Sequence, residues 1–400
     1  MSWEKVKLSE ITEYITDGDH QPAPKSDSGV LFIKIKDIQN NQVSFDNALF
    51  VPQEYYDRLP VNRKAVSGDT LYTVVGSYGI PAFVKHNTPF CFERNIALLH
   101  PNSMVIPKYL YYAVKNPVFF EYAHNIANGS AQKLIPLSKL GDMEISLPPL
   151  DLQQKIVANL SAFDDLIENN EKQIKLLEEA AQRLYKEWFV DLRFPGYEHT
   201  PIVDGVPEGW SACKLSDVIS FKPKVQLSKD RMKQFVPMQA LSTNSMVLDS
   251  SQLTTTTSNS GSKFQNGDTL LARITPCLEN GKTAFVTGIE SDEGAVGSTE
   301  FIVMRSKELN PYMVYLLART DDFRQAAINS MTGSDGRQRA QVDKLEVLPY
   351  LKPTQNVIDS FAHIAEPLFK QIDIKRTQVQ HLIAARDMLL PKLMNGEIEV

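Results

Sequence analysis

The sequence predicts an α+β protein in which a strand-rich unit followed by a long helix occurs twice. Two observations support this prediction. Motifs of the first half return about 205 residues later, and each half closes with a heptad ladder of apolar residues. A long helix with a heptad pattern behaves as a stiff rod that needs a partner helix. We therefore expect two similar heads on two long helices that form an antiparallel coiled coil, related by a pseudo-two-fold axis.

The repeat is visible in short motifs that keep their order in both halves. WEKVKLSEI at 3–11 returns as WSACKLSDV at 210–218, and GDTL at 68–71 returns at 267–270. AFV at 82–84 returns at 284–286, and GS at 129–130 returns at 333–334. This period is far longer than that of a solenoid repeat. It indicates a duplicated domain.

The order of patterns along the chain sets the expected boundaries. These are a first unit over 1–150, a helical spacer over 151–192, a linker rich in proline and glycine over 193–209, a second unit over 210–353, and a second helical spacer with a tail over 354–400. Within the units, 31–35 and 71–75 have the pattern of strands, whereas 107–114 and 311–318 begin with proline, which favours the first turn of a helix.

The two ladders step by alternating threes and fours. The first consists of Leu160, Phe163, Ile167, Asn170, Ile174, Leu177, Ala181, Leu184 and Trp188. The second consists of Ile358, Phe361, Ala365, Leu368, Ile372, Lys375, Val379, Leu382, Arg386 and Leu389. Pro367 lies inside the second ladder, so we expect a kink or a new helix start there.

Asn170 and Lys375 are polar residues near the middle of their ladders and occupy equivalent positions in the repeat. In an antiparallel pair they would face each other. Polar residues at core positions of a coiled coil cost stability and fix the register, so we expect this pair to set the register. The alternative is that both side chains extend into solvent.

Composition limits the class of protein. With 42% hydrophobic residues, 400 residues can form two cores. The N-terminus lacks an apolar signal core and no segment could span a bilayer, while the three cysteines lie far apart, outside any zinc or disulfide spacing. These features predict a cytoplasmic protein without a metal site. The net charge of −6 lacks the broadly basic character of an independent DNA-binding protein.

The chain has no recognisable catalytic motif. The phosphate-binding loop, the nucleophile elbow and the paired zinc ligands are all missing. Asn116-Pro117 resembles part of an amino-methyltransferase motif, but a second proline and a glycine-rich cofactor loop are absent, so we interpret it as a helix stop. We therefore expect no catalytic residues and favour a binding protein.

Candidate contact residues lie where turns and basic clusters are expected. In the first unit they are His20, Gln21, Lys34, Lys36, Ser77, Tyr78, Ser130, Gln132 and Lys133. In the second they are Lys224, Arg231, Arg273, Lys282, Ser334, Arg337, Gln338 and Arg339. Arg and Gln can hydrogen-bond base edges bidentately, and Lys neutralises phosphate. The alternative for each residue is an ordinary surface charge or turn.

Three blocks of sequence support a resemblance to a known family. They are LIPL at 134–137 followed by LPPLDLQQKI at 147–156, FP at 194–195 followed by DGVPEGW at 204–210, and LLPKLMNGEI at 389–398. GDTLLARITP at 267–276 is typical of one type of recognition domain. The whole chain resembles the specificity (S) subunit of type I restriction–modification systems.

The resemblance implies a non-catalytic subunit that reads double-stranded DNA. Each of two target-recognition domains would read one half of a bipartite, asymmetric target, and the helices would set the spacing and dock two methyltransferase subunits. Restriction/translocase subunits would complete the system, and S-adenosylmethionine, ATP and Mg would be used by the partners. Two alternatives stay open: a bivalent protein–protein scaffold without sequence-specific DNA binding, and an enzyme whose site is not recognised.

Overall fold

The computed structural model describes residues 3–39, 41–45, 48–127, 133–334 and 336–398. The chain divides into two compact units, each of which includes part of both long helices. Unit 1 comprises Met1–Asp165 and Leu382–Val400, and unit 2 comprises Leu166–His381. Among the described residues, no helix combines the length and the apolar character needed to cross a membrane.

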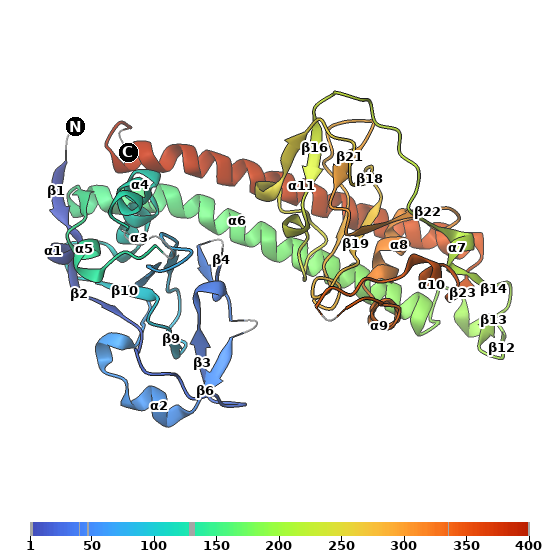
Figure 1. The fold of residues 1–400 in the computed structure, drawn as a ribbon, viewed down its shortest axis with the longest axis horizontal. Helices are drawn as coiled ribbons and strands as arrows, with labels where there is room; N and C mark the ends of the chain where they lie inside the picture. Colours follow the sequence, from blue (N-terminus) through green and yellow to red (C-terminus); the bar gives the residue numbers. More distant parts are fainter. Residues whose placement is uncertain (1–2, 40, 46–47, 128–132, 335, 399–400) are drawn as a thin grey trace. The chain divides into compact units, whose positions relative to one another are not determined.

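Unit 1 contains a four-stranded sheet, a three-stranded sheet and short helices, most of which are labelled in Figure 1. The four-stranded sheet has the order β2 (Thr12–Asp17), β10 (Ile96–Pro101), β7 (Thr70–Thr73) and β8 (Pro81–Phe83). The three-stranded sheet has the order β6 (Leu49–Val51), β3 (Val30–Ile33) and β9 (Phe90–Phe92), with β3 and β9 parallel. β1 (Glu4–Lys7) pairs with β11 (Glu144–Leu147), and β4 (Ile38–Gln39) with β5 (Gln42–Val43). The helices are α1 (Leu8–Ile11), α2 (Gln53–Arg58), α3 (Pro107–Lys115), α4 (Pro117–Ile126) and α5 (Leu137–Gly141).

Unit 2 repeats this topology. Its four-stranded sheet has the order β15 (Ile219–Phe221), β22 (Phe301–Ser306), β19 (Thr269–Ala272) and β20 (Thr283–Phe285). A second sheet has the order β17 (Thr254–Thr256), β16 (Lys233–Val236), β21 (Ala295–Gly297) and β18 (Ser262–Phe264), with β16 and β21 parallel. β14 (Ser211–Lys214) pairs with β23 (Pro349–Lys352), and the helices are α7 (Leu215–Val218), α8 (Pro311–Ala318), α9 (Asp321–Asn329) and α10 (Val342–Glu346). The mixed α and β content agrees with the sequence prediction.

The same motifs position the same elements in both units. Asp69 and Asp268 follow the repeated turn glycine, and each carboxylate accepts a hydrogen bond from a backbone N–H three residues earlier. Each also pairs with a basic side chain on the neighbouring strand, His100 at 2.6 Å and Arg305 at 2.6 Å. Such side chain-to-backbone bonds fix a turn. The repeated GDTL motif therefore anchors the start of β7 and β19.

Asn116 ends one helix and begins the next, as the sequence interpretation predicted. α3 ends at Lys115, and the Asn116 side chain accepts a hydrogen bond from the Val118 N–H at the start of α4. Asparagine is a favoured N-cap because its oxygen satisfies a free backbone donor of the first helical turn. This residue has a structural role.

The long helices are α6 (Leu150–Tyr185) and α11 (Gln355–Met394). α11 continues through Pro367, so the alternative of a new helix start at this proline is wrong. Leu368, directly after the proline, packs against the unit 2 core, and Phe369 is buried in it. This packing holds the helix together at a residue that weakens its backbone hydrogen bonding.

The segment 193–209, expected to be a linker, contains regular structure. It carries a 3₁₀ turn at Tyr197–His199 and a small hairpin of β12 (Ile202–Val203) and β13 (Val206–Pro207). Phe194 is buried, and its ring centroid lies 4.9 Å from that of Trp210. The start of this segment is therefore anchored to the unit 2 core.

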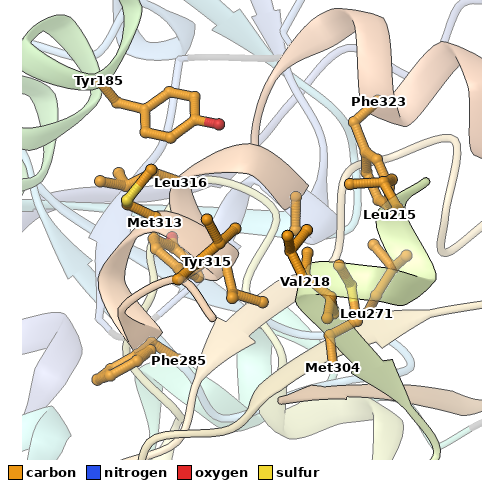
Figure 2. Close-up of a cluster of buried hydrophobic side chains, with 14 of the residues drawn as sticks. Tyr185, Leu215, Val218, Leu271, Phe285, Met304, Met313, Tyr315, Leu316 and Phe323 are labelled. Carbon is orange, nitrogen blue, oxygen red and sulfur yellow. The ribbon is translucent and has the colours of Figure 1, made fainter. Parts of the chain in front are cut away.

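The core of unit 2 is formed by its sheet, its helices and the long helices together. Figure 2 shows Phe285, Met304, Met313 and Tyr315 converging with other buried side chains. Residues of both ladders, including Ile174 and Ile372, belong to the same cluster. The order of contacts shows that the helices are antiparallel in this unit. Phe361 meets Tyr185 near the end of α6, whereas Lys375 lies opposite Asn170.

Polar groups that are buried or half-buried tie each unit to its helices. In unit 2, Glu178 accepts hydrogen bonds from the backbone N–H of Met246, at 2.9 Å, and from the Tyr315 hydroxyl. In unit 1, Asp164 accepts hydrogen bonds from Arg386, at 2.8 Å, and from the Tyr112 hydroxyl, at 2.5 Å. Buried charges are tolerated when such partners are present.

Lys115 joins the unit 1 network, with its Nζ 3.9 Å from Asp164 Oδ1. Burial, and then the charge of Arg386, lowers the pKa of Lys115 from its ordinary 10.5 to about 8. At pH values between about 8 and 10.5, the Lys115 side chain is mostly protonated in the unfolded chain and mostly neutral in the folded chain. The free energy of unfolding of unit 1 therefore gains a contribution that rises with pH in this window.

Replacing Lys115→Met should remove that contribution. From pH 7.5 to 9.5, the wild type should gain about 2 kcal/mol of unfolding free energy relative to the variant. Urea unfolding of both proteins at the two pH values measures this difference, and all titrating groups that they share cancel. Equal pH dependence of the two proteins would contradict the lowered pKa.

Candidate nucleic-acid interface

Three segments meet at one end of the four-stranded sheet of unit 1. The N–H of Val74, just after β7, donates to the Asn95 carbonyl at 2.9 Å, and the Val74 carbonyl accepts from the N–H of Ile135 at 2.9 Å. The N–H of Gly76 donates to the Lys133 carbonyl at 3.2 Å. The turn between β9 and β10, the turn between β7 and β8 and the segment before α5 are thus held side by side. We call these segments the sheet-end loops of unit 1.

Unit 2 holds the equivalent segments with the same pattern of hydrogen bonds. Arg273 donates its N–H to the Glu300 carbonyl at 2.9 Å and accepts from the N–H of Ala340 at 2.8 Å. Thr275 donates its N–H to the Gln338 carbonyl at 3.1 Å. These are the sheet-end loops of unit 2. Several turns that the sequence analysis treated separately therefore form one surface in each unit.

Tyr78 forms an aromatic and basic cluster in unit 1. Its hydroxyl lies 2.6 Å from His124 Nδ1, and its ring stacks on Phe120 with centroids 6.2 Å apart. Lys133 Nζ lies 3.3 Å from His124 Nε2. A Cβ on Gly79 would lie 2.5 Å from the Phe120 ring, so the turn needs glycine. His124 was missed from sequence, because nothing local links α4 to the Tyr78 turn.

The other candidates of unit 1 are distributed around the sheet-end loops. Ser77 is exposed in the Tyr78 turn, and Lys36 is exposed with its Nζ 3.3 Å from Asp37. Ser130 and Gln132 lie outside the described residues. His20, Gln21 and Lys34 line a hollow of about 420 Å³, and His20 Nε2 lies 2.9 Å from Asp17 Oδ2. Arg94 and Asn95, which the sequence analysis did not select, line the same hollow.

In unit 2, part of the candidate set is already engaged within the protein. Arg339 donates to both carboxylate oxygens of Glu300, at 2.7 to 3.0 Å, and these hydrogen bonds lower the pKa of Glu300. Lys282 Nζ donates to the Met238 carbonyl at 3.0 Å. Both side chains thus have structural partners, and Arg339 holds the loop of Glu300 in place.

Other candidates of unit 2 point outward or lack partners. Ser334 and Arg337 are exposed, whereas Gln338 is half-buried. Nε of Arg273 is buried and has no hydrogen-bond partner among the described residues. A buried donor without a partner is costly.

The basic segment before β16 combines exposed cations with one structural lysine. Lys224 is exposed, and Arg231 Nη1 lies 3.5 Å from Glu293 Oε1. Lys233, by contrast, is buried and donates to the Thr257 carbonyl and to Asn259 Oδ1. Lys233 therefore holds this segment to residues 257–259 and has a structural role.

The register candidates face each other. Lys375 Nζ donates to Asn170 Oδ1 at 3.5 Å, and Asn170 is buried. The side chains therefore meet as the antiparallel pairing predicts. Their control of the register stays a prediction.

Comparison with known proteins finds one group of similar proteins. The profile of the type I restriction modification DNA specificity domain matches residues 1–179. A type I restriction enzyme specificity subunit of Methanocaldococcus jannaschii, MjaIX, is 28% identical over 83% of this chain and 78% of its own length. The chain is thus similar to type I restriction specificity subunits over most of its length.

Two further members extend the similarity. The HindI specificity subunit of Haemophilus influenzae is 21% identical over 99% of both chains. The EcoEI specificity subunit of Escherichia coli is 32% identical over 36% of this chain and 25% of its own length. The crystal structure of an S subunit from M. genitalium has a similar fold, with a TM-score of 0.54, 16% identity and coverage of 98% of this chain and 96% of that chain.

The sheet-end loops carry groups that suit recognition of a ligand. In the part of the chain that the structure describes, no cluster of His, Cys, Asp or Glu side chains could hold a metal ion. The sheet-end loops instead present hydrogen-bond donors, an aromatic cluster and cations, which are the groups that contact phosphates and base edges.

Replacing Arg339→Ala should loosen the sheet-end loops of unit 2. The backbones of Thr332 and Arg339 pair with each other at 2.9 and 3.1 Å, and the ion pair with Glu300 supports this pairing. Because the pair is partly exposed, we expect only a modest loss of protection, seen as roughly fivefold faster amide exchange in 330–341. Hydrogen-exchange mass spectrometry measures this rate.

The matched control is Arg337→Ala, since the side chain of Arg337 is exposed and makes no ion pair among the described residues. Exchange in 330–341 should not change in this variant. Equal protection in the wild type and in the Arg339 variant would mean that the ion pair does not hold the loop.

Proposed function

We propose that this chain is the non-catalytic DNA sequence-specificity subunit of a type I restriction–modification system. Target-recognition domains over 1–150 and 210–353 would each read one half of a bipartite, asymmetric target. One observation carries the proposal. Both units hold the same three segments with the same backbone hydrogen bonds, yet present different side chains on them. A common frame with different reading groups is what two unlike half-sites require.

The helical spacers over 151–192 and 354–400 would set the spacing of the half-sites and dock two methyltransferase subunits. Their antiparallel pairing in unit 2 and the similarity to known specificity subunits support this role. Restriction/translocase subunits would join in a full system. S-adenosylmethionine, ATP and Mg would be used by these partners, and the complex would act on double-stranded DNA in the cytoplasm.

The net charge of −6 fits a subunit that reads bases while its partner subunits supply most of the phosphate contacts. Phosphate contacts supply much of the affinity of DNA-binding proteins. A specificity subunit of low basicity can read bases if its partners enclose the duplex and neutralise its phosphates. A bivalent protein scaffold would have the same charge, but it would not need cations and amide groups gathered at the sheet ends.

The proposal is tested by co-expressing the chain with its cognate methyltransferase subunit and mapping adenine methylation across the host genome. We expect one motif made of two short, unlike halves around a fixed gap. If an assembled complex that binds S-adenosylmethionine produces no new methylation, the protein-scaffold function replaces this proposal.

The register role of Asn170 and Lys375 gives a second prediction. The double variant Asn170→Leu with Lys375→Leu should make the helix pair more stable and less specific in register, because polar core residues fix register at a cost in stability. We expect a mixture of gap lengths in the methylated motif, measured by the same mapping.

The control for this variant is Ile174→Leu with Ile372→Leu. Both residues are buried in the same core cluster, and the exchange keeps their volume and apolar character. This control should keep the wild-type gap. If the variant lacking the polar pair also keeps a single wild-type gap, Asn170 and Lys375 do not set the register.

A further inference from the structure

The hollow in unit 1 has two rigid walls. One wall is 19–25, and the other contains Glu93, Arg94 and Asn95 in the turn before β10. A Cβ on Gly18 would lie 2.0 Å from the Phe92 carbonyl oxygen, and Asp19 forms a β-bridge with Glu93. Backbone contact this close requires glycine and locks the walls together. Backbone contacts of unit 1 therefore fix the position of the two walls of the hollow.

The carboxylates at the hollow accept hydrogen bonds from other groups of the protein. Asp19 accepts hydrogen bonds from the Tyr55 hydroxyl, at 3.1 Å, and from the N–H of Gln21, at 3.2 Å, and it pairs with Arg63 at 3.4 Å. Glu93 accepts from the N–H of Ile35 at 2.7 Å. These bonds hold both acids in place, and the ion pair with Arg63 offsets the charge of Asp19.

The cations at the hollow are not engaged in this way. The side chains of Lys25, Lys34 and Arg94 form no ion pair with any of the described residues. The lining therefore holds three cations against the two carboxylates of Asp19 and Glu93, a net formal charge of +1. A positive charge of this kind favours an anionic ligand.

The floor of the hollow is apolar and partly exposed. Leu49 and Phe50 line it, with 40% and 36% of their surface exposed, and Phe32 lies beside them. An aromatic floor beside donors that can bond base edges suits a nucleotide better than a simple inorganic anion, because bases stack on aromatic rings.

We propose that Arg94 and Asn95 read bases of the half-site assigned to unit 1, with Lys25 and Lys34 contacting its phosphates. This inference rests on the proposed function and names the reading residues. Asn95 is fixed through its carbonyl, which accepts the Val74 N–H, so its side chain is presented from a rigid turn. Arg bonds guanine and Asn bonds adenine bidentately in the major groove.

Unit 2 lacks this arrangement at the equivalent turn. At this turn unit 2 has Thr299 and Glu300. The carboxylate of Glu300 accepts hydrogen bonds from Arg339. The two half-sites would thus be read by different segments of the same frame. Changes at Arg94 or Asn95 should consequently affect one half of the target only.

The test uses the full complex with the methyltransferase subunit and compares methylation motifs for Arg94→Ala, Asn95→Ala and wild type. Each variant should relax one or two positions in one half-site, with discrimination there falling about 10- to 100-fold. The other half-site and the gap should stay unchanged. Arg94→Lys keeps the charge and loses the bidentate fork, so it should relax the same position.

The matched control is Arg58→Ala. Arg58 is an exposed arginine of unit 1 that donates to the Glu54 carbonyl within α2 and does not line the hollow. The complex that contains Arg58→Ala should methylate the same motif as the wild-type complex. A thermal melt of each complex confirms that the variants assemble and fold.

Lys25→Ala with Lys34→Ala tests the phosphate contacts. Affinity should fall for all sequences alike, and the slope of log K against log salt should decrease by about 2, since each contact contributes about 0.9. An unchanged salt slope would overturn the assignment of the lysines.

The remaining outcomes are distinct. If the Arg94 and Asn95 variants keep the wild-type motif, or lose methylation uniformly at every base, these residues do not read bases. If the wild-type complex itself gives no bipartite motif, the proposed function fails, whatever the variants show.

Discussion

Each unit depends on the burial of its apolar core against the two long helices. In unit 2, Phe369 of α11 packs on Phe285 and Tyr315 of the head, and Ala181 of α6 belongs to the same cluster. In unit 1, Ile156 and Leu160 of α6 join Leu390 and Leu393 of α11 in the core. The helices are therefore part of each fold. Burying such side chains contributes about 1.5–3 kcal/mol each, which makes the helix contact a main source of stability.

Two acidic side chains lie at these contacts, with Glu178 buried and Asp164 half-buried. Glu178 and Asp164 lie where a head meets the long helices, and each accepts a tyrosine hydroxyl from the head. Hydrogen bonds have strict geometry, whereas apolar contacts tolerate sliding. These hydrogen bonds therefore favour one placement of each head on its helices.

Under the proposed function, one frame would carry two specificities. The backbone bonds that join the sheet-end loops involve no base-reading side chain, so side chains on them can change without loss of the frame. Arg339 in unit 2 serves the frame through Glu300. The structure thus separates candidates that hold the loops from those, such as Arg337, that are exposed. From the sequence alone, an arginine exposed to solvent cannot be distinguished from an arginine that holds a loop.

The sequence by itself determined the duplication, the long helices and the meeting of Asn170 with Lys375, because these depend on local periodicity and on equivalent positions in a repeat. It also indicated Asn116 as a helix boundary. Only the tertiary structure brought Arg94 and Asn95 beside His20 and joined His124 to Tyr78. It also decided that α11 continues through Pro367. These features depend on packing and on pairs of residues far apart in the chain, and neither leaves a local pattern in the sequence.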